Sequence, residues 1–273
     1  MPRDLGDVLD YLLPRAVNAA PATDPSLEAA RETPVDTLAR SPRPPALPIL
    51  ALPIGDHDVV RAAFAWNLTV EIARLGASAT LLASAESNSA PLWPPPGRGP
   101  IGAELALVQT ANLQQLNRAA LDIAVSRAAD ATDGGVVLVR VPLDWMRGAS
   151  NSRALLRWVL LFASPESTDL REAYGLTKSV LGSGATSRVG ITIHGARGIA
   201  EAERAFGRLA GTALRHLRHA VVSYGLLVDD LHVYRAIVAR RPIGLEHPQS
   251  RAARALRDVA RLVLDDSRKQ VVD

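Results

Sequence analysis

A cluster of ionisable residues follows one glycine early in the chain. Gly55 is followed directly by Asp56, His57 and Asp58, and then by Arg61. A loop that binds phosphate has the pattern G-x-x-x-x-G-K-[ST], in which glycines let backbone N–H groups surround the anion. Here two carboxylates occupy such a loop and would repel a polyphosphate, although Arg61 keeps one positive charge. The stretch has the frame of a phosphate loop and lacks most of its chemistry.

The sequence on either side predicts the elements that position this loop. Residues 49–54 form an apolar run typical of a buried strand. Phe64, Leu68 and Ile72 then recur at helical spacing, and Gly76 ends the predicted helix. Strand, tight loop and helix together are the opening unit of a phosphate-binding α/β domain.

Residues 49–76 resemble the deviant phosphate loop of the MinD/ParA family of P-loop ATPases, typically GKGGVGKTT followed by a helix that ends in ARLG. Gly55, Asn67 and the ending at residues 74–76 match this pattern. The mismatches fall on positions that contact nucleotide in the family: Asp56 replaces the signature lysine, His57 and Asp58 replace glycines, Arg61 replaces the phosphate-binding lysine, and Ala62 replaces a threonine.

Later strands continue the resemblance and lose the same kind of group. Ala83 and Ala85 stand where the family has carboxylates that handle magnesium and the attacking water. Arg140 replaces an acid that senses magnesium and the γ-phosphate, and His194 replaces the asparagine that reads adenine. The resemblance therefore implies a vestigial nucleotide site with no metal ligands.

The resemblance extends over residues 47–265, and its second half keeps the strand and helix order best. It implies an α/β domain at residues 47–268, with a mostly parallel twisted sheet of about seven strands and helices on both faces. This is the P-loop NTPase fold of the MinD (SIMIBI-like) kind. The apolar runs of the sequence agree with this fold class.

The beginning of the chain predicts a different organisation. Residues 1–15 are expected to form an amphipathic docking helix, and residues 16–46 a Pro/Ala-rich flexible linker. The apolar face of the helix is made of five aliphatic residues: Leu5, Val8, Leu9, Leu12 and Leu13. Two interpretations stay open, because such a helix can bind a protein partner or pack on its own domain.

Composition excludes several classes of protein. The 273 residues include 31 basic and 28 acidic side chains, a net charge of +3 without a basic block, and no cysteine. This balance gives no support for nucleic-acid binding, and no apolar run is long enough for stable membrane insertion. We therefore expect a cytoplasmic protein.

The combined hypothesis is a catalytically inactive, FlhG-like pseudo-ATPase that takes no cofactor. It would be a scaffold or regulator in positioning or assembling a bacterial cell-envelope or polar machine, such as a flagellum, secretion system or exopolysaccharide system. It could form a homodimer or a heterodimer with a MinD-like paralogue. The alternative is a divergent ATPase that binds ATP phosphates through Arg61 and Arg140. A competing interpretation of Arg140 is an ion pair with Asp56 or Asp58 that fills the pocket.

Overall fold

The computed structural model describes residues 46–86, 93–99, 101–146, 154–182 and 187–272. The chain divides into two units, residues 1–43 and 44–273, and all described residues belong to the second. The expected docking helix at residues 1–15, with its five aliphatic residues, lies outside the described part. The expected linker at residues 16–46 lies outside it too, except for Ala46.

A mixed sheet forms the centre of the second unit. Within the described residues it has eight strands in the order β3-β4-β2-β5-β1-β6-β7-β8, and every neighbouring pair is parallel except β3 with β4. The strands are β1 (Ile49–Pro53), β2 (Ser78–Ser84), β3 (Gly97–Arg98), β4 (Glu104–Val108), β5 (Gly135–Val141), β6 (Trp158–Ala163), β7 (Arg188–Ala196) and β8 (Val222–Val228). This confirms the predicted α/β class; the strand beyond the expected seven is the two-residue β3.

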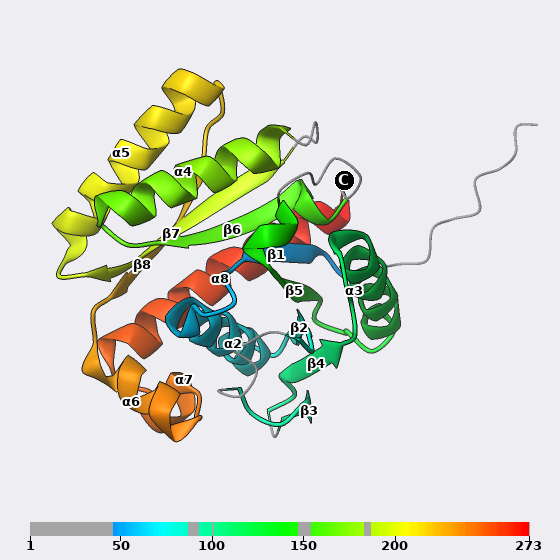
Figure 1. Ribbon diagram of the computed structural model, residues 1–273. Coiled ribbons are helices and arrows are strands. Elements are labelled where there is room, and N and C mark those ends of the chain that lie inside the picture. Colours follow the sequence, from blue (N-terminus) through cyan, green and yellow to red (C-terminus); the bar gives the residue numbers. More distant parts are fainter. Residues whose placement is uncertain (1–45, 87–92, 100, 147–153, 183–186, 273) are drawn as a thin grey trace, which may run out of the picture. The chain divides into compact units, whose positions relative to one another are not determined.

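Helices cover both faces of the sheet (Figure 1). One face packs against α2 and α8, and the other against α3, α4 and α5. Helices α6 and α7 connect β8 to α8. The helices are α2 (Val59–Arg74), α3 (Leu113–Ala128), α4 (Ser167–Gly182), α5 (Ile199–Leu217), α6 (Leu231–Ala239), α7 (Ile243–Glu246) and α8 (Arg251–Val272).

The central strands are apolar along their whole length because both of their faces are covered. All seven residues of β5 (GVVLVRV) and all six of β6 (WVLLFA) are buried. Alternate residues serve opposite cores: Val136 and Leu138 belong to the core under α2 and α8, whereas Val137 and Val139 belong to the core under α3. By its place in the strand, Arg140 falls on the α2 side.

Helix α2 begins and ends where the sequence predicts. The Asp58 carboxylate caps its first turn by accepting a hydrogen bond from the Arg61 N–H at 2.9 Å. The helix ends at Arg74, and Gly76 follows with φ of 89°, a conformation that favours glycine. The loop between β1 and α2 follows the carboxyl end of β1. Because β1 lies between β5 and β6, this loop is held at the middle of the carboxyl edge of the sheet.

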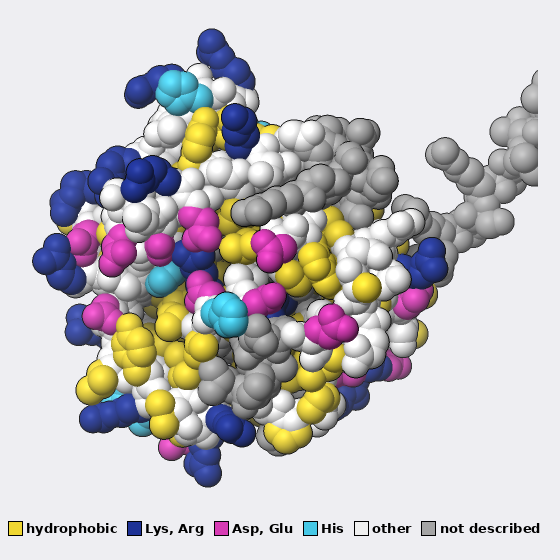
Figure 2. Space-filling view, in the orientation of Figure 1, with side chains coloured by type: hydrophobic (Ala, Val, Ile, Leu, Met, Phe, Trp, Pro, Cys, Tyr) yellow, Lys and Arg dark blue, Asp and Glu magenta, His cyan; other side chains and the backbone are white. Residues whose placement is uncertain are grey.

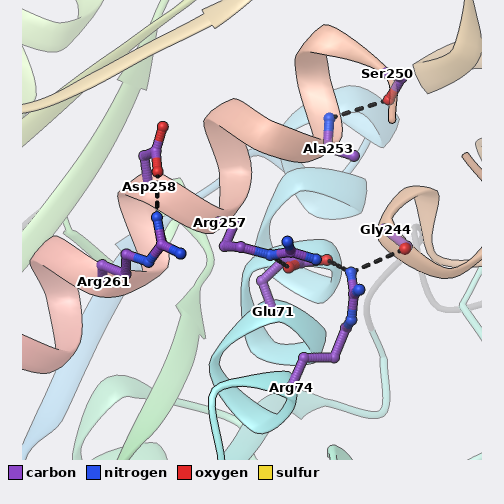
Figure 3. A network of polar contacts seen from close by, with 8 residues as sticks. All are labelled: Glu71, Arg74, Gly244, Ser250, Ala253, Arg257, Asp258 and Arg261. Carbon is purple, nitrogen blue, oxygen red and sulfur yellow. Dashed lines mark hydrogen bonds and ion pairs between the residues drawn. The ribbon is translucent and has the colours of Figure 1, made fainter. Parts of the chain in front are cut away.

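A buried carboxylate fixes the other end of α2 (Figure 3). Glu71 is 1% exposed and pairs with Arg74 at 2.6 Å and with Arg257 of α8 at 3.2 Å. Arg74 also donates to the Gly244 carbonyl oxygen of α7 at 2.8 Å. A Cβ added at Gly244 would lie 1.6 Å from the Glu71 carboxylate, so only glycine allows this close approach. These contacts tie α2, α7 and α8 into one layer.

The last helix is longer than the sequence indicated. We expected it to end near Leu264, but α8 continues to Val272. Asp266 explains the extension, because it accepts a hydrogen bond from the Tyr224 hydroxyl at 2.5 Å and pairs with Arg188 at 2.6 Å. In the described part of the chain, no helix combines the length and apolar character that crossing a membrane requires.

Candidate functional site

The candidate site is a cavity of about 880 Å³ at the carboxyl ends of the central strands. In open parallel sheets, ligands bind at this edge, where the chain leaves neighbouring strands in opposite directions. Its walls come from the loop after β1, the start of α2, the turn after β6, the first turns of α4, and the ends of β7 and β8. Acidic side chains gather across the middle of this face, while Lys and Arg side chains lie mostly around its periphery (Figure 2).

Arg61 is at the centre of the charge distribution in this cavity. Its side chain is 7% exposed and bonds Asp58 at 3.2 Å, Asp169 at 3.0 Å and Glu172 at 2.8 Å. Asp169 and Glu172 come from the beginning of α4. One guanidinium therefore faces three carboxylates, and the cluster has an excess of negative charge.

These contacts shift the ionisation of the groups involved. Burial alone would lower the pKa of Arg61, but the hydrogen bond to Glu172 and the nearby carboxylates raise it. Burial alone would raise the pKa of Asp169, but a hydrogen bond from Ser164 and the charge of Arg61 lower it. Arg61 therefore stays charged near neutral pH, and its guanidinium stays paired with carboxylates of the same chain.

Arg140 makes a second ion pair at the same loop. It is 1% exposed and donates through Nη2 to the Gly55 carbonyl oxygen at 2.8 Å and to Asp56 at 3.2 Å. Its guanidinium also lies 5.7 Å from the ring centre of Trp93. Within the described residues, Nε and Nη1 have no hydrogen-bond partner, and burial lowers the pKa of this arginine. The ion pair considered with Asp56 or Asp58 is thus present with Asp56, but it does not fill the pocket, which keeps a volume of about 880 Å³.

His194 lies near the end of β7 and lines the cavity. Burial lowers its pKa to about 4, and the charge of Arg61 acts in the same direction. Its ring packs against Phe64 at 5.4 Å between centroids, and its Nε2 has no partner among the described residues. The imidazole is therefore neutral at physiological pH.

The groups present do not match a magnesium nucleotide. Ala62 is buried and lacks a hydroxyl, and the first turn of α2 is already capped by Asp58. No group of three or more His, Asp or Glu side chains placed to hold a metal ion occurs in the described ranges. A polyphosphate reaching Arg61 would have to displace Asp169 and Glu172 and would meet their charge.

The structure brings most of the predicted site residues together. Five of them line the cavity with His194: Gly55, Asp56, His57, Asp58 and Arg61. Ala62 and Arg140 do not line the cavity, although Arg140 contacts its loop by donating a hydrogen bond to the Gly55 carbonyl oxygen.

Sequence reasoning missed the acidic wall. Asp169, Glu172 and Asp229 line the cavity and were not predicted as site residues. A signal was present, because Asp169 and Glu172 begin the helix after the turn that follows β6. That helix follows a strand next to β1 in the sheet, so its first turn belongs at the same edge.

Comparison with known proteins identifies the class of fold. No family profile matches the sequence, and no curated protein matches it significantly. Solved structures do match: the chain has the α/β fold of the MinD/ParA P-loop NTPases.

Individual matches are distant in sequence. MinD from Aquifex aeolicus is 15% identical with a TM-score of 0.59, covering 80% of this chain and 97% of that one. The MinC:MinD complex from the same organism is 15% identical with a TM-score of 0.57, and the match covers 80% of this chain and 96% of that one. MinD from Pyrococcus horikoshii, complexed with Mg-ADP, is 14% identical with a TM-score of 0.58, covering 79% of this chain and 95% of that one. A ParA family ATPase from Chlorobium tepidum is 13% identical with a TM-score of 0.54, covering 79% of this chain and 98% of that one. At these identities the likeness establishes the fold.

One expectation needs correction. We expected no cofactor, and the Pyrococcus horikoshii MinD structure with Mg-ADP contradicts this, because the same fold holds a nucleotide there. The residues that replace the nucleotide contacts are visible in the sequence, whereas the cavity of about 880 Å³ is formed only by the fold.

Proposed function

We propose that this chain is a MinD/ParA-like protein that does not hydrolyse ATP and acts as a scaffold or regulator for protein partners. Its role is in positioning or assembling a bacterial cell-envelope or polar machine, such as a flagellum, a secretion system or an exopolysaccharide system. The FlhG-like resemblance of the sequence favours the flagellar case. The proposal concerns hydrolysis, and nucleotide binding is a separate property.

The observation that carries the proposal is the occupation of Arg61 by Asp58, Asp169 and Glu172. Hydrolysis of a phosphoanhydride needs cations free to stabilise charge in the transition state and a metal that bridges the phosphates. In this cavity the central cation is neutralised by three carboxylates, and Ala62 supplies no ligand for a metal. Removing one such group commonly costs about 10²–10³ in rate, so the combined losses leave no useful turnover.

Two further features support a scaffold role. Aquifex aeolicus MinD was solved as a complex with MinC, so a protein of this fold binds a protein partner. The aliphatic face predicted for residues 1–15 gives this chain a candidate partner ligand of its own. A homodimer, or a heterodimer with a MinD-like paralogue, fits the same role.

A phosphate-release assay on the full chain with Mg·ATP tests the proposal. We expect the rate to equal that of the Arg61→Met variant, because neither protein has a free cation at this position. Titration calorimetry with Mg·ATP reports binding independently of turnover. A rate that exceeds that of Arg61→Met would contradict the proposal.

A second candidate is a divergent nucleotide-binding protein that uses Arg61 and Arg140. One observation favours it: Nε and Nη1 of Arg140 have no partner in the described part of the chain. They are buried under the loop, so phosphate would reach them only if the loop moved. The double variant Asp169→Asn/Glu172→Gln frees Arg61 and should strengthen ATP binding relative to the native chain. If Arg140→Met abolishes that gain, both arginines bind phosphate; if ATP affinity is unchanged in every variant, this candidate is wrong.

A further inference from the structure

A second hollow lies along the outer side of α2, away from the candidate nucleotide cavity. It has a volume of about 350 Å³ and shares no lining residue with that cavity. Its apolar lining comes from α2, from the segment around β3, and from α7, which lies beside α2 (Figure 1). The main apolar contributors are Trp66, Val70, Ile101, Ala103 and Leu245, together with the prolines at positions 94–96.

This groove continues toward the end of α6. A smaller hollow there is also lined by Trp66 and Pro94, and additionally by Trp93, Arg240 and Arg241. We call the two hollows together the α2 groove. The larger hollow is lined mostly by apolar side chains, which suits the apolar face of a polypeptide segment.

The two indoles offer the α2 groove apolar ring surface and no accessible donor. The Nε1 atoms of Trp66 and Trp93 are buried, and neither has a hydrogen-bond partner among the described residues. Trp93 as a whole is only 5% exposed. A buried N–H is closed to a ligand in the groove, so a ligand meets the apolar part of the Trp66 ring.

The rim of the groove is cationic. Arg98 and Arg240 are exposed, and neither has an acidic partner within the part of the chain that the structure describes. Arg241 pairs with Glu246 at 3.2 Å, and this pair is exposed. The apolar floor, together with exposed arginines that have no acidic partner among the described residues, selects an acidic ligand with an apolar face.

We propose that the α2 groove binds an acidic amphipathic segment of a protein partner. Apolar side chains of that segment pack on Trp66 and Leu245, and its carboxylates meet Arg98 and Arg240. The site is separate from the candidate nucleotide cavity. Peptide binding and phosphate release can therefore fail independently, and failure of one leaves the other intact.

The test uses the full chain and two helical peptides of equal length. One has leucine on one face and glutamate on the other; in the second, every glutamate is replaced by lysine. We expect the glutamate peptide to bind about tenfold more tightly, since each exposed ion pair contributes modestly and several act together. Equal affinity for the two peptides would overturn the proposal.

Charge reversal locates the binding. In the Arg98→Glu/Arg240→Glu variant we expect the preference to invert, so that the lysine peptide binds more tightly than the glutamate peptide. Both arginines are exposed, so the fold should tolerate the change. Arg204→Glu is the matched control, because Arg204 is exposed on α5, which covers the opposite face of the sheet. If this control changes the preference as much as the double variant does, the interaction is diffuse and the proposal is wrong.

Discussion

Helix α2 carries an arginine–carboxylate cluster at each end, and the two clusters have opposite composition. At its beginning, Arg61 lies among Asp58, Asp169 and Glu172, beside an open cavity. Near its end, Glu71 lies between Arg74 and Arg257, under α7 and α8.

The difference between them is accessibility. Asp169 and Glu172 have side chains 28% and 39% exposed, so water and ligands reach the Arg61 cluster. Glu71 is 1% exposed, and the close approach of Gly244 leaves no room beside it. The partly exposed carboxylates at the strand ends can exchange an ion-pair partner for water or a ligand. The buried Glu71 has no such alternative partner, so loss of its ion pairs leaves an unpaired buried charge. The first is therefore the candidate site and the second is structural.

The largest expected effect is at the Glu71 cluster. Arg74→Met/Arg257→Met leaves a buried carboxylate without a cation, and we expect a loss of roughly 3–5 kcal/mol in unfolding free energy. The triple variant that adds Glu71→Met should recover most of this loss, because the uncompensated charge is gone. Urea denaturation measures both. If the triple variant is no more stable than the double one, packing rather than charge explains the cluster.

His194 should give the next largest effect, through pH. Its folded pKa of about 4 lies below its unfolded value of 6.5. The unfolded chain therefore binds more protons between these values, and native stability falls as pH drops from 6.5 toward 4. His194→Gln should remove this part of the pH dependence, on the order of 1–3 kcal/mol between the two pH values. Denaturation at pH 7 and pH 4.5 measures the unfolding free energy of both proteins. An equal loss of stability between the two pH values in the native chain and in His194→Gln would disprove the prediction.

Arg61→Met should cost less, about 1–2 kcal/mol at neutral pH, because the carboxylates left behind are partly exposed. The pKa of Asp169 is lowered in the folded state. Its stabilising contribution is therefore present above its unfolded value of 3.8 and is lost as pH falls through the folded pKa. The native and variant chains should accordingly converge in stability only as pH falls below 3.8 and through the folded pKa of Asp169. A difference that persists at lower pH would show that Arg61 acts through packing.

The smallest effect is expected at Asp258, which pairs with Arg261 at 2.9 Å on the outer side of α8 (Figure 3). Both side chains are more than half exposed, so solvent screens the pair. Asp258→Ala should change the unfolding free energy by less than about 0.5 kcal/mol. Asp258→Ala is the reference for the three preceding predictions. A larger change in unfolding free energy would mean that an exposed ion pair on α8 is not a suitable reference.

Much of the fold could be predicted because it is encoded locally. The apolar runs of β5 and β6 and the helical spacing after Asp58 each depend on neighbouring residues alone. The two-residue β3 has too few residues to show a period, and it was missed. The length of α8 depends on Tyr224 and Arg188, which are distant in the chain, so its end was misjudged.

The candidate site shows the same division between local and distant information. Sequence alone determined that acidic residues and Arg61 replace the glycines and lysine of a phosphate loop, since those positions follow one another along the chain. Only the tertiary structure decided what Arg61 binds, because Glu172 lies 111 residues away in sequence and reaches it through the pairing of β1 with β6. The sign of the electrostatic field in the cavity depends on such distant pairs, and local sequence patterns do not contain them.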